Sequence, residues 1–111
     1  MTENTYKTRC GGIRYFVNII DKQKTTLVFL PGLTADHRLF EKQIEYFEKK
    51  QNVFVWDAPS HALSRPFTNN YSLSDMAGWL YEILSKEGIF NPIIIGQSMG
   101  GYLAQMYMEL Y

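Results

Sequence analysis

A serine flanked by glycines lies near the end of the sequence, where residues 96–100 read Gly-Gln-Ser-Met-Gly. In the pattern Gly-x-Ser-x-Gly, the serine stands at the apex of a sharp turn between a strand and a helix. Its neighbours must be small because the two elements pass close beside it, and Gly96, Gly100 and Gly101 meet this need. The start of the helix also directs backbone N–H groups toward an anion beside Ser98, which suits acyl transfer.

The residues on either side predict the strand and the helix that this turn requires. Pro92 and Gly96 bound three consecutive isoleucines, which are typical of a strand buried on both faces in a parallel sheet. Apolar residues then recur at helical spacing from Leu103 to Leu110. A phosphate-binding loop is excluded, since neither a Lys-Ser/Thr pair nor Gly-x-Gly-x-x-Gly is present. The alternative is that the glycines permit a tight turn around an incidental serine.

Two upstream stretches strengthen the pattern and give the chain a family resemblance. Residues 30–34 read Leu-Pro-Gly-Leu-Thr and resemble the oxyanion loop of the α/β-hydrolase superfamily, with Pro31 in place of the usual His. Residues 57–64 read Asp-Ala-Pro-Ser-His-Ala-Leu-Ser and resemble the family's Asp-x-x-Gly-x-Gly-x-Ser loop, with Ser60 and Ala62 in place of glycines. The resemblance covers nearly the whole chain but only the N-terminal half of the family fold.

The resemblance implies a fold and a set of site residues. We expect an α/β fold with a mostly parallel sheet, helices on both faces and an antiparallel N-terminal hairpin, formed by residues 1–111 as a single domain. The resemblance makes Ser98 the catalytic nucleophile and the backbone N–H groups of Leu33 and Met99 the oxyanion hole. Gln97 beside the serine is expected to pack or form hydrogen bonds, and Gln97 and Trp56 are possible substrate-lining residues.

The catalytic acid and base are harder to identify. The family order is Ser, then Asp or Glu, then His, but the 13 residues after Ser98 contain Glu109 and no histidine. Glu109 lies 11 positions along the same helix, about 16 Å away, so it cannot serve as the acid. His37 or His61 could act as the base from upstream, although His61 matches a structural residue of the family. Asp57 is expected to hold its turn by accepting backbone N–H groups.

Regular elements are predicted along the rest of the chain by periodicity and capping signals. A hairpin of strands 6–10 and 13–20 is expected around Gly11 and Gly12. A helix over residues 37–50 is expected after an Asp36 cap. A second helix is expected to begin at the capping box formed by Ser72 and Asp75 and to end at Gly88. The remaining buried strands are predicted at 27–30 and 53–56.

Composition excludes several other functions. The 111 residues are 46% hydrophobic and 20% charged with zero formal net charge, which favours a globular domain and no nucleic-acid or anionic membrane partner. No apolar run approaches the roughly 18 residues of a membrane span, and residues 1–5 lack a leader's features, so we expect a cytoplasmic protein. Cys10 is the only cysteine and is expected to be a half-buried strand residue. No metal or cofactor is expected.

These observations predict an esterase- or lipase-like serine hydrolase. Its small-molecule acyl substrate would be a carboxylic ester, thioester or small amide that forms an acyl-enzyme on Ser98. We expect the 111 residues to be an incomplete and inactive fragment, with a bare apolar edge at residues 93–95. One alternative is a non-catalytic α/β domain that binds a ligand or partner. Another is a homo-oligomer in which two chains pair through this edge.

Overall fold

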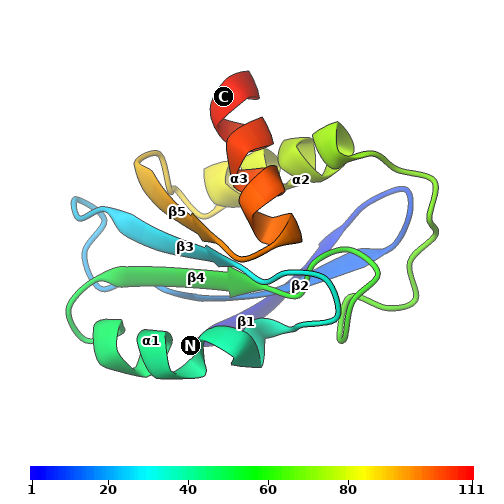
Figure 1. Ribbon diagram of the computed structural model, residues 1–111. Coiled ribbons are helices and arrows are strands. Elements are labelled where there is room, and N and C mark those ends of the chain that lie inside the picture. The colour runs from blue at the N-terminus through cyan, green and yellow to red at the C-terminus, as the bar shows by residue number, and fades with distance from the viewer.

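A five-stranded mixed sheet in the order β1-β2-β4-β3-β5 forms the centre of the molecule. The computed structural model describes residues 1–111 (Figure 1). Strands β3, β4 and β5 are parallel, whereas β2 is antiparallel to both β1 and β4. The expected α/β fold with an antiparallel N-terminal hairpin is confirmed. The strands are β1 (Thr2–Lys7), β2 (Gly12–Asn18), β3 (Thr26–Leu30), β4 (Asn52–Trp56) and β5 (Pro92–Gly96).

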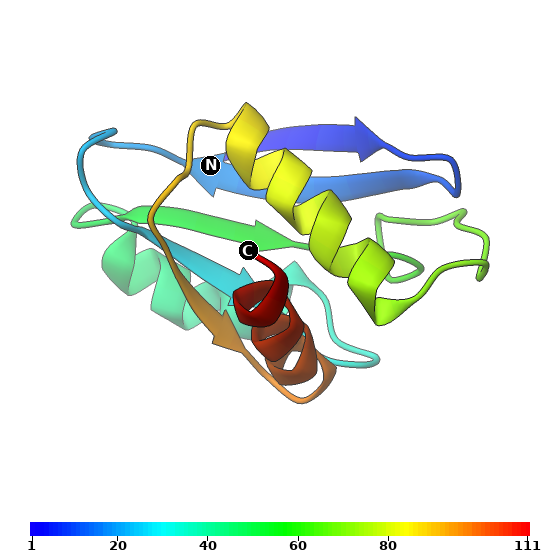
Figure 2. The same cartoon turned by 90° about the horizontal axis from the view of Figure 1, so that it is seen from above.

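Helices cover both faces of this sheet, as expected (Figures 1 and 2). The 3-10 helix η1 (His37–Phe40) and α1 (Glu41–Phe47) lie on one face. Helices α2 (Leu73–Lys86) and α3 (Met99–Leu110) lie on the other. None of these helices has the length and apolar character needed to cross a membrane.

The two faces of the sheet form separate parts of the core because side chains alternate along each strand. Strand β4 illustrates this: Val53 and Val55 join the smaller cluster beneath η1 and α1, while Phe54 and Trp56 join the larger cluster beneath α2 and α3. All five residues of β4 are buried. Because β4 is central and fully buried, it holds the start of the next loop, at Asp57, in a fixed position.

The N-terminal hairpin turns earlier than expected. Its strands are Thr2–Lys7 and Gly12–Asn18, and the turn occupies residues 8–11. The Thr8 side chain explains the difference, because its hydroxyl oxygen accepts the backbone N–H groups of Cys10 and Gly11, each at 3.1 Å. Cys10 consequently lies buried in the turn, and its prediction as a half-buried strand residue is wrong.

The first helical segment is also shorter than the predicted range of 37–50. Asp36 caps it as expected, with its side chain accepting the Arg38 N–H at 2.8 Å. The first four residues form a 3-10 helix, and α1 ends at Phe47. Phe40 and Ile44 are buried against the sheet and form the inner face of this segment.

Strand β5 is the edge of the sheet, so the prediction that it is buried on both faces is wrong for this chain. It pairs with β3 on one side only. The Ile93 side chain is 49% exposed, and nearby Phe90 and Met108 are 80% and 72% exposed. The bare apolar edge expected for this part of the chain is therefore present.

The capping box of α2 supports a stability prediction. The Ser72 hydroxyl accepts the Asp75 N–H at 3.2 Å, and the Asp75 carboxylate accepts the Ser72 N–H at 2.9 Å. Ser72→Ala should lower the free energy of unfolding by about 1 kcal/mol, because the Asp75 N–H loses its acceptor. Ser85→Ala, within the same helix, is the control and should have little effect. Chemical denaturation measures both, and equal effects would contradict the capping role.

Candidate active site

Ser98 lies at the apex of the turn that joins β5 to α3. Strand β5 ends at Gly96 and α3 begins at Met99, so only two residues separate the elements. The backbone of Ser98 has φ 57° and ψ −118°, a strained conformation for a non-glycine residue. The Ser98 side chain makes no capping bond to the helix, and the residue is exposed. The turn therefore presents the hydroxyl to solvent.

Two of the three expected glycines are required by close backbone contacts in this turn. A Cβ on Gly96 would overlap the carbonyl of Gly100, and a Cβ on Gly100 would overlap the carbonyl oxygen of Leu30. Neither backbone atom can move without separating α3 from β5 or β3. Gly101 differs, because a Cβ there would lie 3.7 Å from the Gly96 oxygen, an ordinary contact. The expectation that Gly101 must also be small is wrong.

The loop after β3 packs directly against the serine turn. Gly32 is buried, and a Cβ on it would overlap Gln97 Oε1 and lie 2.8 Å from Ser98 Cβ. The Gly32 N–H donates to Gln97 Oε1 at 3.0 Å. The Gln97 N–H donates to the Leu30 carbonyl at 3.1 Å and continues the pairing of β3 with β5. Two segments that lie 65 residues apart in the sequence are thus joined by the hydrogen bond between Gly32 and Gln97.

The backbone N–H groups of Leu33 and Met99 are both available to an external acceptor. The Leu33 N–H makes no hydrogen bond within the chain. Met99 is the first residue of α3, where helix geometry supplies no acceptor, and no cap bond engages its N–H. The Leu33 side chain is 63% exposed, in a loop where Thr34 has φ 65° and Ala35 donates to the Gly32 carbonyl at 3.1 Å. One free donor thus follows Ser98 in the sequence, and the other lies in the loop after the neighbouring strand β3.

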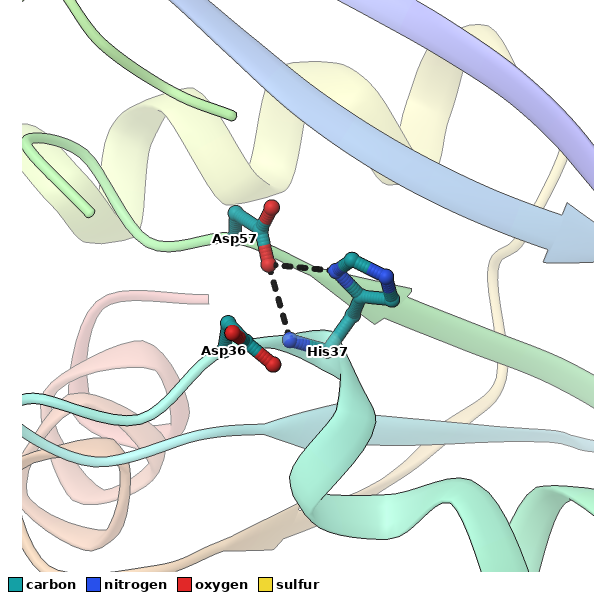
Figure 3. Close-up of side chains that lie close together, drawn as sticks. All are labelled: Asp36, His37 and Asp57. Atoms are coloured by element: carbon teal, nitrogen blue, oxygen red, sulfur yellow. Dashed lines mark hydrogen bonds and ion pairs between the residues drawn. The ribbon is translucent and has the colours of Figure 1, made fainter. Parts of the chain in front are cut away.

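A buried carboxylate joins the loop after β3 to the loop after β4. Asp57 is fully buried, and its Oδ1 accepts both the backbone N–H of His37 and its ring Nδ1, each at 2.8 Å (Figure 3). Its Oδ2 accepts the Leu63 N–H at 3.1 Å. Asp57 therefore accepts backbone N–H groups as expected. Its pairing with His37 was not expected, because only the fold brings residues 20 positions apart together.

The carboxylates beside His37 already have partners. Asp36, His37 and Asp57 place potential metal-ligand atoms within 4.8 Å of one another (Figure 3). However, Asp36 accepts hydrogen bonds from the Arg38 guanidinium, which lowers the pKa of Asp36 to about 2. Asp57 is occupied by three N–H groups. Hydrogen bonding accounts for this cluster, and we assign no metal to it.

Several residues considered from the sequence lie away from Ser98 or are engaged elsewhere. Trp56 is fully buried in the larger core cluster, so its aromatic ring packs the core and is not a lining residue in this chain. His61 Nδ1 contacts the Pro59 carbonyl at 3.1 Å. Glu109 is exposed near the far end of α3.

The surface cavities do not enclose the serine turn. Five cavities are present, and none is lined by Ser98, Leu33 or Met99. Gln97 likewise lines none of them, and its side-chain oxygen points to Gly32. The described residues provide a serine and two N–H donors on an open surface, without the walls of an acyl pocket.

The adjacent glycines of α3 provide a matched test of the turn. Gly100→Ala should destabilise the protein by about 3 kcal/mol, because the new methyl group must displace the end of β3. Gly101→Ala should change stability by less than about 1 kcal/mol, in the stabilising direction, because alanine favours the helix. Chemical denaturation measures the free energy of unfolding of both variants. Similar effects in both would contradict the close approach of α3 to Leu30.

Comparison with known proteins identifies the family to which this chain belongs. A family model described as alpha/beta hydrolase fold matches residues 25–111. A Mycoplasma genitalium protein named "Putative esterase/lipase 2" is 27% identical over 85 residues, which are 75% of this chain and 32% of that protein.

Solved structures agree on the fold. A "Putative Hydrolase" from Rickettsia typhi superposes with a TM-score of 0.86 at 21% identity, covering 100% of this chain and 44% of the other. The enzyme 1H-3-hydroxy-4-oxoquinoline 2,4-dioxygenase gives 0.84 at 19% identity, covering 97% and 41%. The chain thus spans less than half the length of each protein compared here. It belongs to the α/β-hydrolase family and carries part of that fold.

Proposed function

We propose that this chain is part of a serine hydrolase that cleaves a carboxylic ester, thioester or small amide. The observation that carries the proposal is the exposed, strained Ser98 beside two free backbone N–H groups, one at the start of α3 and one in the loop after β3. The name of the Mycoplasma genitalium relative supports an ester substrate. The fold alone does not decide the reaction, because a protein named as a dioxygenase shares it.

In the proposed reaction, the Ser98 oxygen attacks the acyl carbonyl carbon as a base removes the hydroxyl proton. The carbonyl oxygen becomes an oxyanion that accepts hydrogen bonds from the N–H groups of Leu33 and Met99. Loss of one such donor typically raises the barrier by about 3 kcal/mol. The tetrahedral intermediate then expels an alcohol, thiol or amine, which receives the proton. Water hydrolyses the resulting ester of Ser98 and regenerates the hydroxyl.

We propose that the base and its acid partner come from sequence outside these 111 residues. No hydrogen bond joins Ser98 to either histidine of the chain, and the ring Nδ1 atoms of His37 and His61 contact Asp57 and the Pro59 carbonyl. No histidine follows Ser98 in this sequence. The matched proteins are more than twice as long, which leaves room for the missing groups.

The open edge of the sheet supports the same proposal. A groove of 530 Å³ follows this edge between β5 and α3. Its lining is mostly apolar: Pro92, Ile93, Ile94, Ala104, Gln105 and Met108. Bare strand edges of this kind pair readily with another strand. We propose that further chain covers the groove in the active protein, and that the 111 residues alone are inactive. Pairing of two copies through β5 is the alternative.

Hydrolysis by the complete protein tests the assignment of Ser98. Ser98→Ala should lower kcat/KM for activated esters such as p-nitrophenyl acetate by at least about 10³-fold, since no acyl-enzyme can form. Ser85→Ala should retain activity. Intact mass after exposure to a fluorophosphonate should show one adduct, which Ser98→Ala abolishes. Undiminished hydrolysis by Ser98→Ala would overturn the proposal. Ligand binding with no adduct and no turnover would favour the non-catalytic domain.

A further inference from the structure

We propose that Gln97 is a positioning residue that holds the oxyanion loop against the nucleophile through the Gly32 amide. This inference rests on the proposed role of Ser98. Gln97 immediately precedes the serine, yet its side chain reaches back to the loop after β3, where Oε1 accepts the Gly32 N–H at 3.0 Å. The contact links one proposed oxyanion donor, Leu33, to the strand that carries Ser98.

The hydrogen bond from Gly32 has no replacement within the fold. Gly32 is buried, and its N–H donates only to Gln97. The backbone is too close for a side chain at this position, because a Cβ on Gly32 would also lie 2.5 Å from the Gln97 carbonyl oxygen. A buried N–H that loses its acceptor destabilises the local structure. Truncation of Gln97 should therefore displace the loop, because the Gly32 N–H must then find another acceptor.

The loop is anchored at two points, and Leu33 lies between them. Gln97 holds its first part through Gly32, and Asp57 holds its end through the His37 N–H at 2.8 Å. Between these anchors, Ala35 donates to the Gly32 carbonyl and Thr34 has a left-handed φ of 65°. Leu33 itself makes no hydrogen bond through its N–H. Gln97 is therefore the nearer anchor for this donor.

An anchor of this kind affects the transition state more than the bound substrate. The oxyanion donors must lie about 2.7–3.1 Å from the developing charge. A misplacement of about 1 Å can lower the rate about 100-fold. Glutamine is suited to the position because it offers an acceptor oxygen without negative charge. A carboxylate could accept the same N–H but would repel the nearby oxyanion.

Amide hydrogen exchange in the complete protein tests the contact itself. Gln97→Met has similar length but no acceptor, so exchange at Gly32 should accelerate at least about tenfold. Gln97→Glu retains an acceptor oxygen and should keep Gly32 protected. Gln43→Met, at an exposed position on α1, is the matched control and should change nothing. Unchanged Gly32 exchange in Gln97→Met would overturn the proposal.

Kinetics test the consequence for catalysis. Gln97→Met should lower kcat for p-nitrophenyl acetate about 10- to 100-fold, with KM changed less than about threefold. Affinity for a trifluoromethyl ketone, which forms a tetrahedral adduct, should fall in parallel. Full kcat in Gln97→Met together with loss of activity in Ser98→Ala would refute the role of Gln97 alone. Full activity in both variants would refute the proposed function. An unchanged circular dichroism spectrum of Gln97→Met would exclude loss of the fold as the cause of its lower kcat.

Discussion

The close approach of helix α3 to the end of strand β3 is the constraint on which the rest of the structure depends. Gly100 faces the Leu30 carbonyl with no space for a side chain, and Gly96 faces the Gly100 carbonyl in the same way. With both elements this close, only two residues are left for the connection, and Ser98 is forced to a positive φ. Packing of the backbone thus determines the exposure of the serine.

The same geometry brings the loop after β3 into contact with the serine turn. Because β3 and β5 are adjacent and parallel, Leu30 is paired with Gly96, and both loops leave the same edge of the sheet. Gln97 and Gly32 meet immediately beyond that edge. Asp57, at the end of the central strand β4, then fixes the far end of the loop through His37. The residues of the proposed active site are therefore held by loops that follow three neighbouring strands, β4, β3 and β5.

Local sequence signals predicted much of this arrangement. The glycines around Ser98, the isoleucines before it and the capping box at Ser72 each reflect short-range constraints, and each element formed where expected. The hairpin turn was misplaced because the Thr8 hydroxyl accepts the N–H groups of Cys10 and Gly11 and so draws residues 8–11 into the turn. Burial of β5 was also wrong, because burial depends on a neighbouring strand that a local pattern cannot reveal.

Contacts within the candidate site were less predictable for the same reason. The pairs Gln97–Gly32 and Asp57–His37 join residues 65 and 20 positions apart, so only the strand order brings them together. Trp56 was considered as a possible substrate-lining residue. Its place on the inner face of a central strand puts it in the core instead.

A crystal structure of the complete protein after reaction with a fluorophosphonate would test the role of Ser98 and of both oxyanion donors together. We expect a covalent bond between Ser98 Oγ and phosphorus. We also expect a phosphoryl oxygen within about 3 Å of the backbone nitrogens of both Leu33 and Met99. A phosphoryl group attached elsewhere, or an oxygen directed away from these two N–H groups, would contradict these roles.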